Sequence, residues 1–322
     1  MLVKSRTLFA LSATITQNLP RIFAYHRFSN DPDPLKRKID ALSFESQIKQ
    51  LTKDWNVYSL KDYISRCQRD GRAPSRSVVL TIDDGYCDFY EIAYPILRKY
   101  NIPATLFPTV NFVSGKILLW PDKISYALDN ARRIDLRIQH GAIVFNLDLS
   151  TSHSRLHAWQ TLADYCLTIG NQAKFDFIHM LEDSLYLSPP QSQPSEYKAV
   201  NWSQLTEMST NGIEIGSHTM NHPILNRVPL LEAEQEIVLS KRTIEANINE
   251  PVITFCYPNG RLVDISIEIV RRVQDAGYVG GVTTESKLDF FDYFMMPRIH
   301  TNNDKNNFLW NLSGIEFITP MK

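Results

Sequence analysis

Residues Leu80–Tyr86 read LTIDDGY, and in them an apolar run ends in two adjacent aspartates. The residues SVVLTID at 77–83 predict a buried strand, and Gly85 predicts a turn directly after it. Adjacent carboxylates repel each other, and each loses hydration where it is buried. A segment needed only for folding rarely combines these costs, so Asp83 and Asp84 indicate a functional site at a strand end.

Strand-like and helix-like segments alternate on both sides of this stretch. Strands joined by helices of this length favour parallel βαβ units, and about seven strand candidates favour an α/β barrel that is distorted or incomplete. In such barrels the chemistry lies where the strands end, and Asp83, His26 and His218 fall at those positions. The strand candidates are residues 21–25, 77–83, 104–110, 212–218, 252–258, 278–284 and 295–301, and the helix candidates are 44–55, 88–100, 229–248 and 263–275.

Residues 116–200 interrupt this alternation and end in the loop-like sequence SPPQSQPSEY. We interpret them as a largely helical insertion that caps or borders the site. Its helix candidates are residues 121–133, 154–168 and 171–184, and a hairpin candidate lies near 135–149.

The first twenty residues, MLVKSRTLFALSATITQNLP, form an extension before the main domain, residues 21–322. Lys4 and Arg6 precede a short apolar stretch, which is a feature of signal peptides, but polar residues soon interrupt it. We expect a partly amphipathic helix that lies on the domain. The alternatives are a cleaved signal peptide and contact of the apolar helix face with a membrane surface.

The composition narrows the classes of partner. The 322 residues include 34 basic and 35 acidic side chains, for a formal net charge of -1, so nothing favours nucleic acid or an anionic membrane as the main partner. A neutral sugar chain fits this balance. The four cysteines form no CxxC pair, and no apolar run approaches the roughly 18 residues of a spanning helix. Scattered thiols favour a cytoplasmic protein or one peripheral to the membrane, with an exported form as the alternative.

A second functional pattern is SHTMNHP, residues 217–223. His218 and His222 are four residues apart, so on one helical turn both imidazoles would face the same way and form a metal-binding pair. Two histidines and one aspartate make a three-ligand set for zinc that leaves a position open for water. The alternative is structural: His222, before Pro223, caps a turn, and His218 is an ordinary core histidine.

Together these motifs resemble the polysaccharide deacetylase family, whose members share the NodB homology domain. Residues 81–85, TIDDG, are similar to the family's TFDDG, with Ile in place of Phe. Residues 218–222, HTMNH, match its HxxxH, and residues 255–260, FCYPNG, stand where the family has a variant of RxPYG. The resemblance covers most of 20–300 apart from the insertion. It implies a NodB-like barrel and a metal-dependent hydrolase that removes N-acetyl groups from amino sugars of a polysaccharide or its precursor.

The resemblance also implies roles for the residues that match. Asp84, His218 and His222 would be the ligands of a divalent metal, with zinc expected and cobalt, nickel or iron compatible with the same ligands. Asp83 would be the general base that takes a proton from the attacking water, a task that suits a carboxylate with a modestly raised pKa. The structural alternative is that Asp84 caps the following helix and Asp83 is a solvated loop residue.

Residues 255–260 depart from the family pattern at Cys256, where the family has an arginine that holds the base. Arg298, in MPRIH, is the candidate to replace it, and a surface salt bridge is the alternative for this residue. The backbone amide of Asn259 follows the motif's proline and would stabilise the charge on the acyl oxygen.

The general acid is expected to be a histidine. His26, in AYHRF, resembles the YH motif of a permuted branch of the family, the deacetylases of exported poly-N-acetylglucosamine, and is preferred. His300, in PRIHT, is the alternative by its position near the C-terminal end. A pKa in the neutral range suits either residue to protonating a leaving amine.

The expected partner is an N-acetylated amino-sugar oligosaccharide or polysaccharide. Trp120 and Trp202 border the insertion and are candidates for stacking on sugar rings, with ordinary packing as the alternative. Two rival functions remain at this stage. The same site could cleave an O-acetyl ester or another non-peptide C–N bond, or the departure at Cys256 could mark an inactive carbohydrate-binding protein.

Overall fold

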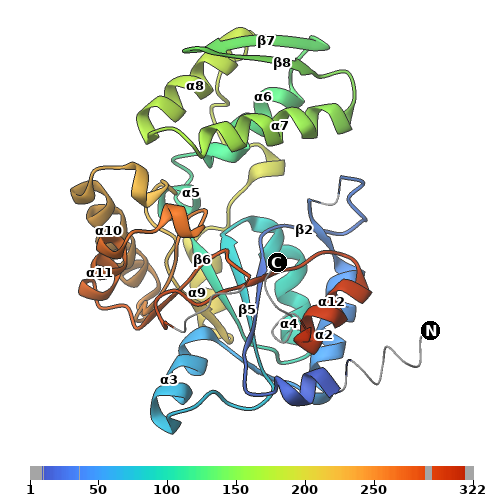
Figure 1. Cartoon of the computed structure of the whole chain (residues 1–322), viewed down its shortest axis with the longest axis vertical. Helices are drawn as coiled ribbons and strands as arrows, with labels where there is room; N and C mark the ends of the chain where they lie inside the picture. Colours follow the sequence, from blue (N-terminus) through green and yellow to red (C-terminus); the bar gives the residue numbers. More distant parts are fainter. Residues whose placement is uncertain (1–8, 10, 36, 287–291, 316–322) are drawn as a thin grey trace.

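Seven parallel strands form a distorted barrel (Figure 1). The computed structural model describes residues 9, 11–35, 37–286 and 292–315. Five strands pair in the order β12-β1-β5-β6-β9, β10 pairs with β11, and the bridges Ser217–Phe255 and Val282–Met296 join the two sheets at both edges. The predicted barrel is therefore confirmed. Its strands are β1 (Arg21–Tyr25), β5 (Ser77–Asp84), β6 (Ala104–Pro108), β9 (Ile213–Ile215), β10 (Thr254–Cys256), β11 (Gly280–Val282) and β12 (Ile299–His300).

Strand β5 lies at the centre of the main sheet, and all eight of its residues are buried. It pairs in parallel with β1 on one side, and with β6 and the short β4 (Asn56–Tyr58) on the other. A parallel strand covered on both faces needs a continuous apolar run, which SVVLTI supplies. The strand extends one residue beyond the predicted end and includes Asp84, so both aspartates are held by the sheet.

Helices follow the strands, as the alternation predicted. The predicted helix at 88–100 consists of a π-helical turn, Phe89–Ala93, and the helix α4 (Tyr94–Lys99), with Pro95 in the first turn of α4. Proline is tolerated there because the first helical N–H groups have no partner within the helix. The other helices around the barrel are α2 (Ala41–Asp54), α3 (Leu60–Asp70), α5 (Val110–Val113), α9 (Trp202–Thr210), α10 (Leu230–Ile248), α11 (Ile267–Asp275) and α12 (Lys305–Ser313).

The insertion forms a layer of its own above the carboxyl ends of the barrel strands (Figure 1). Its apolar side chains, among them Leu162, Phe177 and Leu181, make a hydrophobic cluster separate from that of the barrel. The three helices and the hairpin that the sequence predicted are confirmed. They are α6 (Trp120–Asp129), β7 (Asp135–His140), β8 (Ile143–Asp148), α7 (Ser152–Cys166) and α8 (Asn171–Ser184).

The N-terminal extension is described from Phe9, apart from residue 10, and residues 1–8 lie outside the described part. Residues 11–15 are helical, as expected, and the segment after them packs on α12. Thr16 Oγ1 donates a hydrogen bond to the carbonyl oxygen of Ser313 at 3.2 Å, and Arg21 Nε donates to that of Leu312 at 3.1 Å. Within the described ranges, no helix combines the length and apolar character needed to cross a bilayer.

Candidate active site

Three side chains from two distant parts of the chain meet at the carboxyl end of the barrel. Asp84 Oδ1, at the end of β5, lies 3.6 Å from His218 Nε2 and 3.5 Å from His222 Nε2, both in the loop after β9. The two imidazole rings are 4.8 Å apart between centroids, and all three residues are buried. The structure thus brings together the residues that the sequence predicted as metal ligands.

The backbone at the end of β5 explains how two adjacent aspartates reach one pocket. Neighbouring residues of a strand point to opposite faces, but Asp84 has a φ of 73° and Gly85 a φ of 95°, so the chain turns at this point. A side chain at Gly85 would be strained at this φ, and its Cβ would lie 3.0 Å from Val113 Cγ1. The turn predicted at Gly85 is therefore present, and glycine is required there.

The prediction of a helical turn for His218 and His222 is wrong. They lie in a loop in which Thr219 and His222 have φ values of 68° and 58°. The backbone of this loop is already hydrogen-bonded across the barrel, from His218 N to Pro108 O at 3.2 Å and from Val110 N to Thr219 O at 3.1 Å. These bonds exclude the i to i−4 pattern of a helix, and the two imidazoles meet through loop geometry instead.

A carboxylate from a helix behind the loop fixes this geometry. Glu236 Oε2 of α10 accepts hydrogen bonds from the backbone N–H groups of Met220 and Asn221, each at 2.8 Å. Its Oε1 accepts a further bond from the Asn221 side chain at 2.6 Å. The loop between the two histidines is thus held from outside the pocket.

The cluster fits a divalent cation. His218 Nδ1 donates to the carbonyl oxygen of Cys256 at 2.7 Å, which leaves the lone pair of Nε2 facing Asp84. Separations of 3.5 and 3.6 Å are long for hydrogen bonds but close to the ~3.3 Å between donors of a tetrahedral site with bonds of about 2.0 Å.

The pKa shifts of the three residues are also consistent with a bound cation. Burial lowers the pKa of both imidazoles, so they are neutral, as ligands must be. Burial, together with the nearby Asp83 and Asp122 carboxylates, raises the pKa of Asp84 well above its ordinary value. A bound cation would offset that crowding of negative charge.

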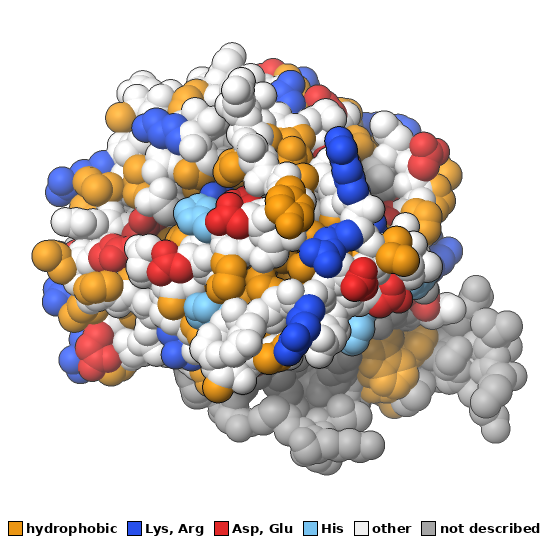
Figure 2. All heavy atoms as spheres, turned by 90° about the horizontal axis from the view of Figure 1, so that it is seen from above, with side chains coloured by type: hydrophobic (Ala, Val, Ile, Leu, Met, Phe, Trp, Pro, Cys, Tyr) orange, Lys and Arg blue, Asp and Glu red, His pale blue; other side chains and the backbone are white. Residues whose placement is uncertain are grey.

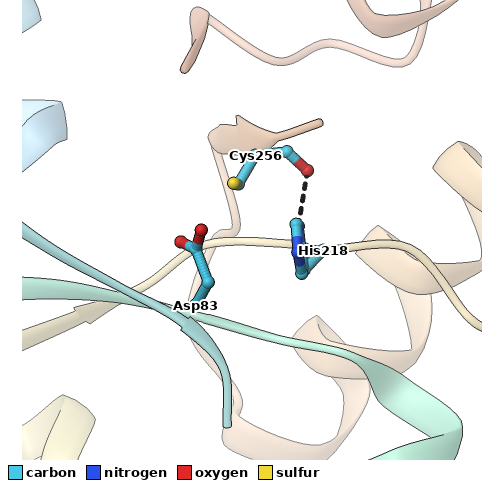
Figure 3. Close-up of side chains that lie close together, drawn as sticks. All are labelled: Asp83, His218 and Cys256. Carbon is cyan, nitrogen blue, oxygen red and sulfur yellow. Dashed lines mark hydrogen bonds between the residues drawn. The ribbon is translucent and has the colours of Figure 1, made fainter. Parts of the chain in front are cut away.

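A second group of side chains shares His218 with this cluster. The ligand atoms of Asp83, His218 and Cys256 also lie within 4.8 Å of one another (Figure 3). Both oxygens of Asp83 are engaged by Arg298, however, and burial raises the pKa of the Cys256 thiol well above its ordinary value. The thiolate is the form that binds metal, so this second group positions His218 and does not form a ligand set.

Arg298 reaches the pocket from the segment just before β12. Its guanidinium donates to both carboxylate oxygens of Asp83 at 2.7 Å, and both side chains are buried. It also donates to the carbonyl oxygen of Thr283 at 2.7 Å and lies 3.2 Å from the sulfur of Cys256. Arg298 thus contacts the carboxylate that an arginine at position 256 would hold, and the surface-salt-bridge alternative is wrong.

The pairing with Arg298 shifts the pKa of Asp83 in the direction opposite to the expected one. Burial alone would raise the pKa of this carboxyl, but the Arg298 guanidinium and His26 hold the pKa well below its ordinary value. The modestly raised pKa expected from the sequence is therefore wrong, because a guanidinium bonded to both oxygens of Asp83 outweighs the effect of burial. Asp83 is ionised throughout the neutral range and is buried rather than solvated.

Of the two candidate acids, His26 is the one that lines the pocket. His26 Nε2 lies 3.4 Å from Asp83 Oδ2, and its side chain is 41% exposed. Desolvation at the pocket wall lowers the pKa of His26 to about 4, although Asp83 opposes this shift, so the pKa in the neutral range that the sequence led us to expect is wrong for this residue. His300 is exposed, and its Nε2 contacts the carbonyl oxygen of Thr284 at 3.2 Å. The geometry therefore favours His26 over His300.

Asn259 borders the same pocket in a left-handed conformation, with a φ of 61°. Its carbonyl oxygen accepts a hydrogen bond from Thr284 Oγ1 at 2.6 Å, which fixes the peptide plane. Among the described residues, no acceptor takes its backbone N–H. The amide predicted to stabilise an oxyanion is thus available at the pocket wall.

The pocket has a volume of ≈ 460 Å³ and is walled by both the barrel and the insertion. Viewed from above the insertion (Figure 2), acidic and basic side chains are interspersed and neither sign dominates this face. Neither Trp120 nor Trp202 is among the lining residues. Trp120 is buried in the insertion, and Trp202 packs against the barrel core, which confirms the packing alternative for both. Trp159 of α7 lines the pocket instead.

Asp122, Tyr86 and Arg27 also line the pocket, although no prediction from the sequence included them. The hydroxyl of Tyr86 donates to Asp122 Oδ2 at 2.7 Å, and Arg27 lies 4.0 Å above the Tyr86 ring. Burial raises the pKa of Asp122 to about 7, although Arg27 opposes the shift. Two of the three could have been predicted from their positions in the sequence, because Tyr86 follows the aspartate pair and Gly85, and Arg27 directly follows His26. Asp122 lies in the insertion, where no motif marks it.

The raised pKa of Asp122 predicts a pH-dependent effect of Asp122→Asn on metal-free protein. The ordinary pKa of an unfolded aspartate is about 4, so between pH 4 and about 7 the folded state holds a proton that the unfolded state has lost. This contribution to stability is complete below pH 4 and is lost as the pH rises to about 7. We expect the variant and the wild type to be equally stable near pH 4. Between pH 4 and about 7 the variant should become more stable than the wild type, by at most about 1.4 kcal/mol for each pH unit.

Urea denaturation at pH 4, 6 and 8 measures this difference. Asp129→Asn is the matched control, since Asp129 lies on the same helix and also accepts from a tyrosine hydroxyl, that of Tyr197 at 3.2 Å. A stability difference for Asp122→Asn that does not grow with pH would contradict the assignment.

Comparisons with known proteins agree with this geometry. The sequence model of the family described as polysaccharide deacetylase matches residues 70–134 and 184–280, about half of the chain. YxkH of Bacillus subtilis, named as a polysaccharide deacetylase, is 23% identical over 265 residues, or 82% of this chain and 64% of that protein. The poly-β-1,6-N-acetyl-D-glucosamine N-deacetylase of Staphylococcus aureus is 41% identical over 81 residues, or 25% of this chain and 28% of that protein. The aligned region thus spans less than two thirds of either relative.

The fold has solved counterparts. The deacetylase PplD of Streptococcus pyogenes, solved in complex with acetate, superimposes with a TM-score of 0.60 at 17% identity and covers 91% of this chain and 97% of its own. This likeness shows a shared fold. The family match includes both the strand that carries Asp83 and Asp84 and the loop that carries His218 and His222. The chain therefore belongs to the polysaccharide deacetylase family.

Proposed function

We propose that this protein is a metal-dependent hydrolase that removes N-acetyl groups from amino sugars of a polysaccharide or its precursor. The observation that carries the proposal is the buried cluster of Asp84, His218 and His222 beside a second carboxylate, Asp83, that Arg298 holds in place. The name of the Staphylococcus aureus relative, an N-deacetylase of poly-β-1,6-N-acetyl-D-glucosamine, supports an amino-sugar substrate.

The three-ligand cluster would hold the divalent cation. Zinc is the expected ion, and cobalt, nickel or iron would accept the same ligands. When bound there, the cation polarises an acyl oxygen and lowers the pKa of water. Asp84, His218 and His222 contribute two neutral nitrogens and one carboxylate to this site.

The remaining residues move protons and stabilise charge. Asp83, ionised because of Arg298, accepts a proton from the water that attacks the acyl carbon. The backbone N–H of Asn259 donates to the acyl oxygen as negative charge develops on it. His26, 3.4 Å from Asp83 and neutral at neutral pH, takes that proton from Asp83 and passes it to the departing nitrogen. The products are acetate and a free amine.

The structure does not favour an inactive carbohydrate-binding protein. That alternative depended on the arginine missing at Cys256, and Arg298 makes the corresponding contact with Asp83. An O-acetyl esterase would use the same water-activating residues but would need less protonation of its leaving alcohol. Acetate release from N-acetylglucosamine oligomers, compared with release from O-acetylated sugars, therefore tests the proposal, and hydrolysis of the esters alone would overturn it.

Zinc is expected to stabilise the wild-type protein but not His222→Gln. A ligand present at 100 times its dissociation constant stabilises the folded state by about 2.7 kcal/mol. The variant loses one nitrogen of the cluster, so the shift in melting temperature on zinc addition should largely disappear. His179→Gln, which changes an exposed histidine of α8, is the matched control and should respond like the wild type. An equal zinc response in His222→Gln would remove this histidine from the ligand set.

A further inference from the structure

The insertion contributes directly to the wall of the active-site pocket. The barrel side of the pocket carries His26, Asp83 and the metal cluster. The opposite side is formed by Leu156, Trp159 and Gln160 of α7 and by Ser125 of α6. A substrate bound at the metal cluster therefore lies between the barrel and α7.

Trp159 is held in a fixed orientation on that wall. Its Nε1 donates a hydrogen bond to the carbonyl oxygen of Pro121 at 3.1 Å. The helix face that carries Ala158, Leu162 and Cys166 is buried in the insertion, whereas Trp159 remains partly exposed and lines the pocket. A partly exposed indole whose polar edge is already bonded offers an apolar face for the C–H groups of a sugar ring.

A second cavity lies beside Trp159. It has a volume of ≈ 110 Å³, shares five lining residues with the first and extends along α7 to Ser152 and Arg155. The shared residues are Leu35, Arg37, Ser125, Leu156 and Trp159. Trp159 thus borders two neighbouring cavities, and of these two the first is lined by the metal cluster.

Two of the three cations that line the first cavity are paired with carboxylates, and the third, Arg37, lines both cavities. Lys38 is paired with Glu196 at 2.6 Å, and Arg27 is paired with Asp88 at 2.7 Å. Ser125 and Gln160 provide neutral hydrogen-bonding groups beside the indole. The rim therefore combines one flat apolar surface with polar groups, as a sugar requires.

From these observations we propose that α7 forms a subsite for a second sugar ring, in which Trp159 stacks on the residue next to the one being deacetylated. The proposal rests on the proposed function for its substrate class and adds that the substrate is an oligosaccharide longer than one ring. The subsite is not implied by family membership, since the family match omits residues 135–183, which include all of α7.

The test compares chain lengths in wild-type protein, Trp159→Leu and Trp159→Phe. Acetate release from N-acetylglucosamine monomer, dimer and tetramer is measured with zinc-loaded enzyme, using β-1,4- and β-1,6-linked series. We expect Trp159→Leu to lower kcat/KM on the tetramer about tenfold while changing the monomer less than twofold, because an aromatic contact of this kind contributes roughly 0.5–1.5 kcal/mol, or up to about tenfold. Trp159→Phe should retain most of the activity on the tetramer. Trp310→Leu, a partly exposed tryptophan of α12 outside the pocket, is the matched control.

Binding separates this proposal from the proposed function. Calorimetry of the monomer, dimer and tetramer with zinc-loaded protein should show affinity that rises with chain length in the wild type, and this rise should be lost in Trp159→Leu, whether or not acetate is released. Acetate release that is independent of Trp159 at every chain length would overturn the subsite while leaving the deacetylase intact. Length-dependent binding through Trp159 without acetate release from any oligomer would support the subsite and overturn the proposed activity. An equal loss on monomer and tetramer would also overturn the subsite.

Discussion

Asp83→Asn should lower kcat for acetate release by about 10²–10⁴-fold while the protein still binds zinc. The amide is nearly isosteric with the carboxylate but cannot accept the proton of the attacking water. Asp84, His218 and His222 are unchanged in this variant, so metal binding should survive. Acetate release and zinc content, measured on the same preparation, check both parts of the expectation.

The controls for this variant are set by the residues around it. Asp83→Asn leaves the buried Arg298 without its counter-charge, so a thermal melt must show that the variant is folded at the assay temperature. His300→Gln is the matched control for His26→Gln, because the two rings lie 6.4 Å apart but only His26 contacts Asp83. We expect activity to fall in His26→Gln and to persist in His300→Gln. Unchanged turnover in folded, zinc-loaded Asp83→Asn would remove Asp83 from the mechanism.

The sequence predicted those parts of the site that depend on strand order. An apolar run that ends in Asp83 and Asp84 has to be a buried parallel strand, and strands of this kind present their ends on one side of a barrel. The same reasoning placed His26 and His218 at that side, and the structure brings these residues together. Local pattern and topology were sufficient here because each residue lies at the end of a strand or within three residues after it.

Other features could not be predicted because they depend on contacts between distant segments. The spacing of His218 and His222 favoured a helix, but this segment donates a hydrogen bond to the Pro108 carbonyl oxygen and accepts one from the Val110 N–H, and these bonds impose a loop. The low pKa of Asp83 depends on Arg298, which is 215 residues away in the sequence. The sequence around Trp159 does not distinguish it from other residues of an amphipathic helix. Only the packing of the insertion over the barrel places it in the pocket.

The pairing of Arg298 with Asp83 leads to the second large effect, in Arg298→Met. Removing one partner of a buried ion pair leaves an uncompensated charge and costs about 3–5 kcal/mol. Both side chains are buried and joined by two hydrogen bonds of 2.7 Å, so water cannot easily replace the guanidinium. We expect metal-free Arg298→Met to lose stability by this amount at pH 8, as measured by urea denaturation.

The pH dependence of this loss follows from the sign of the pKa shift. In the wild type the pKa of Asp83 is held below its ordinary value, so the pair contributes stability above pH 4 that is lost only as the pH falls below that value. Without Arg298, only His26 and His218 oppose the effect of burial, which is the largest single cause, so we expect the pKa of Asp83 to rise above its ordinary value. The variant can then protonate Asp83 at mildly acidic pH, so its deficit relative to the wild type should be smaller at pH 5 than at pH 8.

Two further variants make this prediction specific to the pair. Arg298→Met combined with Asp83→Asn removes both charges, and we expect it to be more stable at pH 8 than Arg298→Met alone. Arg69→Met is the matched control, because Arg69 also bonds both oxygens of an aspartate, Asp70, at 2.7 and 3.1 Å, but both side chains of that pair are exposed. Water can replace that guanidinium, so the loss should be much smaller than that of Arg298→Met. A deficit of Arg298→Met that is equal at both pH values, or that the double variant fails to relieve, would show that Arg298 stabilises the barrel by packing and not by holding the charge of Asp83.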